Sequence, residues 1–218
     1  VVPNRASFCV QCSPSRVGTK IQLVHHGIYA PNRGIEYLIE ALSALPDSYV
    51  LNLMLLRAPW SELRRRARRL SIDDSRLVFH EPTTPDVLVG VLNKFDIEVL
   101  LLRESTKNIE GGLPNKLFEA VQARLAMASV PLVEVASLIE EFDFGWVAED
   151  FSTEAFVRVL TGITATDIAT KKRNSHLAAE ILSWESFESE LVREISASLL
   201  RDRADSVGPF GTVLGSGA

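Results

Sequence analysis

The fold is decided by residues 21–56, IQLVHHGIYAPNRGIEYLIEALSALPDSYVLNLMLL. The stretch opens with a short apolar run at 21–25. It ends with another at 49–56, which is nearly continuous and so predicts a strand buried on both faces. Between them, in 34–45, apolar side chains recur with the spacing of one helix face, at Ile35, Leu38, Ile39 and Leu42. A strand, a helix and a strand in this order predict a parallel sheet.

The same alternation continues along the chain to residue 148. Periodicity predicts further helices at 60–70, 85–95, 114–124 and 132–142. Short apolar runs predict further strands at 76–79, 97–102, 126–130 and 146–148. Beyond residue 153 the pattern is helical only, at 154–161, 168–182 and 184–200. We therefore expect an α/β fold, a doubly wound parallel sheet with helices on both faces and a C-terminal helical extension. Such sheets bind ligands beyond the carboxyl ends of their strands.

The composition fits a globular protein, because 46% of the 218 residues are hydrophobic and only 23% are charged. A net charge of −5 argues against a general nucleic-acid binder, whose affinity depends on clustered Lys and Arg. No stretch approaches the roughly 20 consecutive apolar residues of a membrane span, so we expect a soluble, cytoplasmic protein. The chain begins VVPN, without Met, which suggests a cut inside a longer polypeptide.

The strongest candidate site is residues 108–119, NIEGGLPNKLFE, which follow the strand expected at 97–102. Pro114 suits the first position of a helix, and the two preceding glycines let a ligand approach the backbone. A helix start attracts anions, and Lys116 adds a full positive charge, so a phosphate or diphosphate is the expected ligand. Glu119, on the same helix face, could accept hydrogen bonds from sugar hydroxyls. The alternative is an ordinary helix start with a surface Lys116/Glu119 pair.

A second candidate is residues 25–34, HHGIYAPNRG. Gly27 leaves room at a strand end, and the guanidinium of Arg33 can clamp phosphate oxygens with two donors. The alternative is that Arg33 is an ordinary surface residue. His25 and His26 adjoin the same strand end, but consecutive strand residues point to opposite faces. We therefore expect at most one of the two rings to reach a ligand.

Two further features leave alternatives open. The run RRRARR at 64–69 could form a basic helix that contacts anionic lipid head groups, at the periphery of a membrane, or a phosphorylated acceptor. The alternative is that it forms a solvated helix face. Cys9 and Cys12 form a single C-x-x-C without a second ligand pair, so we expect an inert, reduced pair rather than a metal or redox site. No metal and no other cofactor is expected.

Taken in order, these motifs resemble the C-terminal half of the GT-B retaining glycosyltransferases of family 4, the glycosyl transferases group 1. The most specific match is LPNKLFEA at 113–120, which is similar to the P-N-K-L-F-E variant of the donor-binding motif. Residues 26–36 resemble the Gly-rich strand end of the family, followed by a basic residue and Gly. VVPN at 1–4 looks like the passage between the two domains, and SWE at 183–185 resembles the start of the final helix, which crosses back.

The resemblance implies that a nucleoside-diphosphate sugar is the donor substrate. Arg33 and Lys116 would bind its diphosphate and stabilise charge on the leaving group, while Glu119 would bind the ribose hydroxyls. The sugar and phosphates would be surrounded by Gly27, Glu110, Gly111, Gly112, Leu113 and Asn115. The sequence departs from the family pattern at three places, one of which is RLA at 124–126, where the family commonly has Gly-x-Pro. Glu110, the candidate catalytic glutamate, stands one position before the family's first glutamate, and Ile28 stands where many members have Arg.

This reading divides the chain into four parts: an interdomain linker at 1–18, a Rossmann-like donor-binding domain at 19–182, a crossover helix at 183–200 and a flexible tail at 201–218. The acceptor would be held by a missing N-terminal domain, so the isolated half of this hexosyltransferase-like enzyme is expected to be inactive. Two alternatives stay open. One is a degenerate, non-catalytic GT-B-like module for binding or assembly, and the other is an unrelated phosphate-binding α/β regulator.

Overall fold

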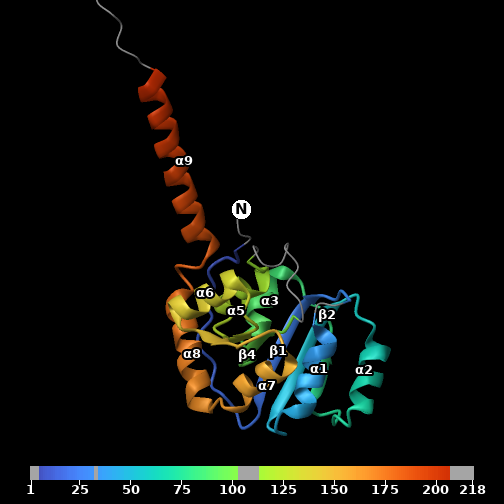
Figure 1. The fold of residues 1–218 in the computed structure, drawn as a ribbon. Coiled ribbons are helices and arrows are strands. Elements are labelled where there is room, and N and C mark those ends of the chain that lie inside the picture. Colours follow the sequence, from blue (N-terminus) through green and yellow to red (C-terminus); the bar gives the residue numbers. More distant parts are fainter. Residues whose placement is uncertain (1–4, 32–33, 103–112, 207–218) are drawn as a thin grey trace, which may run out of the picture.

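The computed structural model describes residues 5–31, 34–102 and 113–206, with side chains as far as Ser198. Its strands are β1 (Ile21–Ile28), β2 (Tyr49–Leu56), β3 (Leu77–His80), β4 (Ile97–Leu100), β5 (Ala126–Ser129) and β6 (Gly145–Val147). Its helices are α1 (Ile35–Ala44), α2 (Trp60–Arg69), α3 (Pro85–Leu92), α5 (Asn115–Gln122), α6 (Val133–Phe142), α7 (Thr153–Thr161), α8 (Ala165–Ala178) and α9 (Trp184–Ser206). Figure 1 shows their arrangement.

The six strands form one parallel sheet in the order β3-β2-β1-β4-β5-β6. Helices lie against both faces: α1 contacts α2 and α7, whereas α3 and α8 contact α5 (Figure 1). The expected doubly wound fold is thus confirmed. The chain builds outward from β1 to β3 and then returns to place β4 beside β1. Such a reversal of strand order leaves a crevice at the carboxyl ends of the two strands, where open α/β sheets bind their ligands.

The core consists of the apolar strand runs and the apolar helix face that the sequence predicts to be buried. Strands β4 and β5 are buried along their whole length, and β2 is buried from Tyr49 to Leu55. The helix face predicted between the first two strands is buried as well, at Ile35, Leu38, Ile39 and Leu42. Removal of this apolar surface from water is the main driving force for the fold.

One glycine fixes how α1 meets the sheet. Gly34 precedes α1 with φ of +86°, a left-handed conformation that residues with a side chain rarely adopt. A Cβ at this position would lie 1.5 Å from the carbonyl oxygen of Leu101, so the backbones of the two segments touch there. Glycine is therefore required both for the turn and for the close approach of α1 to the end of β4.

The N-terminal segment, residues 5–12, packs beside the start of α9. The backbone N–H of Cys9 donates to the side chain of Gln122, and the Trp184 N–H donates to the carbonyl of Ala6. From its first turn α9 projects away from the body of the domain (Figure 1), and it continues beyond residue 200, where the helix was expected to end. Cys9 and Cys12 are joined in a disulfide, so the expectation of a reduced pair is wrong.

The expected strands and helices are all present, with shifts at their ends. The last expected strand begins at Gly145, and the helix expected at 168–182 occupies Ala165–Ala178 because Thr164 and Asp167 form a capping box that starts it earlier. Among the described residues, no helix has both the length and the apolar character needed to cross a membrane.

Candidate functional site

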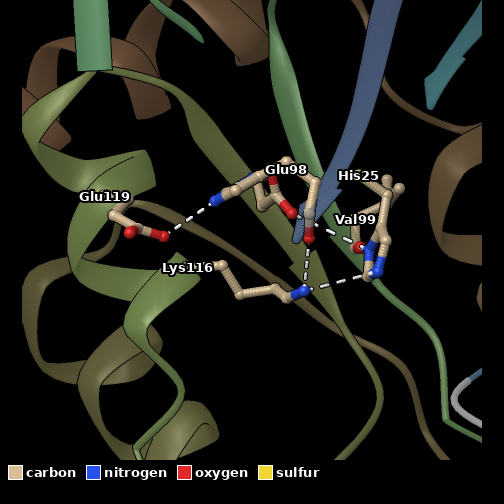
Figure 2. Close-up of polar contacts among 6 residues, drawn as sticks. His25, Glu98, Val99, Lys116 and Glu119 are labelled. Carbon is tan, nitrogen blue, oxygen red and sulfur yellow. Dashed lines mark hydrogen bonds and ion pairs between the residues drawn. The ribbon is translucent and has the colours of Figure 1, made fainter. Parts of the chain in front are cut away.

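The candidate site lies where β1 and β4 end side by side and α5 begins. Helix α5 starts at Asn115. Pro114 was expected to be the first residue of the helix, but it is the residue before it. Pro114 has an extended backbone, with φ of −71° and ψ of 141°. Lys116 and Glu119 therefore stand in the first two turns of α5, and both side chains extend from the helix toward β1 and β4 (Figure 2).

Lys116 reaches the end of β1. Its Nζ donates a hydrogen bond to the carbonyl oxygen of His26 at 2.5 Å and lies 3.5 Å from Nε2 of His25 (Figure 2). The other ring nitrogen of His25, Nδ1, lies 2.7 Å from the carbonyl oxygen of Val99. Because a carbonyl can only accept, Nδ1 carries the proton, and the Nε2 lone pair faces the ammonium group of Lys116.

Glu119 contacts the neighbouring histidine. Nε2 of His26 donates to Oε2 of Glu119 at 2.8 Å, and Nδ1 of the same ring donates to Oε2 of Glu98 at 3.0 Å. His26 is only 3% exposed and Glu98 is fully buried, whereas 24% of the Glu119 side chain is exposed. With a carboxylate at each nitrogen, His26 is an imidazolium that bridges a buried acid to an accessible one.

The two adjacent histidines thus differ in charge. Burial, and then the positive charge of Lys116, keep the pKa of His25 well below its ordinary value, so this ring is neutral. For His26 burial acts in the same direction, but the charge of Glu98 and the hydrogen bonds that the ring donates to both carboxylates outweigh it and raise the pKa to about 9. Burial raises the pKa of Glu98, which His26 and Lys116 oppose. The cluster therefore contains two cations, His26 and Lys116, and two carboxylates.

Gly27 leaves open space beside the amine of Lys116. Its φ is +112°, and a Cβ there would lie 3.1 Å from Nζ of Lys116, so any larger residue would crowd the amine. A hollow of about 40 Å³ beside it is lined by residues that include His26, Gly27, Met54 and Leu56. A larger groove of about 990 Å³ is lined by residues of the N-terminal segment and of α3, and its walls include Asn115 and Glu119.

The structure brings together only part of the predicted site. Gly27, Lys116 and Glu119 converge, Leu113 is half-buried and packs on the core, and Asn115 is exposed at the start of α5. Four other predicted residues lie outside the described residues, namely Arg33, Glu110, Gly111 and Gly112. Their roles stay predictions.

Sequence reasoning missed Glu98. A carboxylate in an apolar strand run is a visible signal, but only the pairing of β1 with β4 supplies its partner. Each histidine ring contacts a predicted binding residue, because Lys116 and Glu119, three positions apart on α5, reach β1 at two different residues. The expectation that at most one ring reaches a ligand stays a prediction.

The arginine-rich run lies on α2, away from this cluster. Arg64 stacks on the ring of Phe79, Arg65 lies 3.9 Å from Glu62, and Arg66 is paired with Glu40. Arg68 and Arg69 are exposed. Several of these charges thus have protein partners, and contact with a membrane or a phosphorylated acceptor stays a prediction.

Solved structures with the same architecture were found by structural comparison. WaaG, a glycosyltransferase involved in lipopolysaccharide biosynthesis, aligns with a TM-score of 0.59 and 18% identity over 77% of this chain and 46% of its own. HepE of Anabaena, solved in complex with UDP and glucose, aligns with a TM-score of 0.67 and 15% identity over 83% of this chain and 49% of its own. The C-terminal domain of LpcC, a glycosyl transferase group 1 family protein from Francisella tularensis, aligns with a TM-score of 0.55 and 14% identity. The alignment covers 73% of this chain and 84% of that domain.

The likeness is one of fold. The neighbours are GT-B glycosyltransferases, and the sheet and helices of this chain match the C-terminal half that the motifs predict. The chain spans less than half the length of WaaG and of HepE. No family model and no curated protein sequence matches it.

Proposed function

We propose that this chain is the donor-binding half of a glycosyltransferase and binds a nucleoside-diphosphate sugar. The observation that carries the proposal is the joint placement of Lys116 and Glu119 at the reversal point of the sheet. An ammonium group and a partly exposed carboxylate, both from the start of one helix, supply what a diphosphate and a ribose require. The proteins of similar fold include one solved with UDP and glucose, which supports the same ligand class.

In this proposal each residue has a separate role toward the donor. Lys116, the start of α5 and Arg33 hold the diphosphate, and they bind it more tightly as negative charge develops on the leaving nucleoside diphosphate. Glu119 accepts hydrogen bonds from the ribose hydroxyls. Gly27 admits the phosphates beside the Lys116 amine, and the segment from Glu110 to Leu113 surrounds the transferred hexosyl group.

The acceptor is proposed to bind to a separate N-terminal domain. Two described features support this: the N-terminal segment and the first turn of α9 lie side by side, and α9 leaves the domain with Val192 and Ile195 exposed on it. A helix with exposed apolar residues is suited to contact a second domain. The isolated half is therefore expected to bind the donor without transferring the sugar.

The test is a calorimetric titration of the chain with UDP, GDP and ADP and with their sugar conjugates. Lys116→Ala removes a charged contact worth about 1.5–3 kcal/mol, so the affinity should fall roughly 10- to 100-fold. Lys20→Ala is the matched control, because Lys20 is an exposed lysine directly before β1, at the opposite end of that strand. It should bind as the unaltered chain does.

Two results would decide against the proposal. If the chain binds none of the nucleotides, or if Lys116→Ala binds as well as Lys20→Ala, the donor site is not where we place it. Binding of inorganic phosphate or of simple phosphorylated metabolites in the absence of nucleotide binding would favour the phosphate-binding regulator. A chain joined to its N-terminal domain that binds the donor but neither hydrolyses nor transfers it would favour the non-catalytic module.

A further inference from the structure

The buried carboxylate of Glu98 has no evident structural use. It comes from the middle of β4, where its neighbours Ile97 and Val99 are apolar core residues. Its Oε1 has no hydrogen-bond partner, although the atom is shielded from solvent. Burying a charged group is costly unless it is paired, and an apolar residue at this position would avoid that cost. Oε2 accepts a hydrogen bond from Nδ1 of His26, and the Nδ1 of His25 lies 3.8 Å from Oε1, beyond hydrogen-bond distance.

We propose that Glu98 is a positioning residue which, through the imidazolium of His26, holds the carboxylate of Glu119 ready for the ribose hydroxyls of the donor. This inference rests on the proposed function and adds a residue that no binding motif contains. The geometry is a continuous chain of hydrogen bonds, in which His26 donates from Nδ1 to Oε2 of Glu98 and from Nε2 to Oε2 of Glu119.

The arrangement fixes one carboxylate oxygen of Glu119 and leaves the other available to a ligand. Oε2 is held by His26, whereas the described residues offer no hydrogen bond to Oε1. Glu119 also lines the groove of about 990 Å³, so a ligand in that groove can reach the carboxylate. A carboxylate with one oxygen anchored loses less conformational freedom when it binds hydroxyls, and pre-ordering of this kind increases affinity.

The positive charge of His26 has a second effect. The proposed site places a diphosphate near Glu119, and two negative groups close together repel each other in a partly buried site. A neutral imidazole has a single N–H and no net charge, so it could neither satisfy both carboxylates nor offset this repulsion. Glu98 keeps His26 charged, and its influence therefore reaches the ligand without direct contact.

The test measures how well the chain distinguishes a ribonucleotide from one without ribose hydroxyls. We would titrate the chain with UDP and with 2′,3′-dideoxy-UDP, in the unaltered form and in Glu98→Gln, Glu119→Gln and the double variant. If the nucleotide with the highest affinity has another base, its ribo and dideoxy forms are used. The unaltered chain should prefer the ribo form by roughly 10-fold or more, as expected for lost hydrogen bonds to a charged group.

Glu119→Gln should lose most of this preference, and so should Glu98→Gln. The double variant should lose no more than either single one, because both act through one chain of contacts. Asp96→Asn is the matched control: it neutralises another buried carboxylate, two residues earlier, that pairs with Lys172 instead. It should lower only the stability of the fold and leave the ratio of ribo to dideoxy affinity unchanged.

A second measurement reads the contact without any ligand. The ring signals of His26 in NMR should titrate with a pKa near the value of about 9, and in Glu98→Gln the midpoint should move down toward 6.5. The other groups that face this ring are His25 on β1 and Lys116 and Glu119 on α5, and these are unchanged in the variant. An unchanged midpoint would overturn the inferred pairing.

The two proposals fail in different ways. If Glu98→Gln keeps the preference for the ribo form while Glu119→Gln loses it, donor binding stands and the positioning role of Glu98 is wrong. If Glu98→Gln weakens the ribo and dideoxy forms equally, the role of Glu98 is merely structural. If the unaltered chain binds no nucleotide at all, the proposed function and this inference both fall.

Discussion

His26 should make the stability of the folded chain depend on pH. Its pKa of about 9 in the fold, against 6.5 for an ordinary histidine, means that the folded state binds this proton more tightly than the unfolded state does. The resulting stabilisation is fully present below about pH 6.5 and is lost as the pH rises through about 9. Replacing His26 with Gln should remove this dependence.

The magnitude follows from the same two values. Each pKa unit corresponds to about 1.4 kcal/mol, so a rise from 6.5 to about 9 amounts to about 3 kcal/mol of unfolding free energy. His26 is only 3% exposed, so screening by solvent is small. Burial raises the pKa of its partner Glu98, and the charge of His26 opposes that rise.

The assay is urea unfolding at about pH 6 and about pH 9.5, with the unfolding free energy extrapolated to water. The unaltered chain should lose about 3 kcal/mol more between the two pH values than His26→Gln does. His80→Gln is the control, because burial lowers the pKa of His80 and its titration lies below the window. Equal losses in the unaltered chain and in His26→Gln would refute the assigned charge state.

Three other substitutions test how the fold holds together. Gly34→Ala should cost at least about 3 kcal/mol in urea unfolding, because its Cβ would overlap the carbonyl of Leu101 at a left-handed φ. Lys172→Met should cost about 3–5 kcal/mol in the same assay, since it leaves the buried carboxylate of Asp96 without its cation. Arg124→Met should speed cleavage of the N-terminal segment in limited proteolysis, because the buried guanidinium holds that segment through a backbone carbonyl. A cleavage rate equal to that of the unaltered chain would contradict this role.

The order of the elements could be predicted from the sequence because it depends on local patterns. A helix face repeats every three or four residues and a buried strand is a continuous apolar run, and both signals are read without knowing any partner. The boundaries were less accurate where a cap decides them. Thr164 and Asp167 start α8 earlier than its apolar pattern suggests, and Pro114 precedes α5 instead of beginning it.

The candidate site could be predicted where its residues belong to recognisable sequence motifs, as Gly27 and the residues of 113–119 do. Lys116 and Glu119 belong to one motif, so their shared role could be inferred together. Glu98 could not be linked to His26, because their contact depends on β4 returning to lie beside β1, which no local pattern encodes. The charge of each histidine likewise depends on which acceptors the packed sheet places at its nitrogens.

Helix α5 has a mechanical consequence. Its first turns carry Lys116 and Glu119, while Gln122 at its end and Arg124 just after it hold the backbone of Cys9. The helix has 8 residues and is therefore about 12 Å long. Because these contacts join the N-terminal segment to α5, we expect a displacement of the segment to shift the helix and, with it, Lys116 and Glu119. A partner that displaces the N-terminal segment would therefore change the positions of the residues that we propose bind the donor.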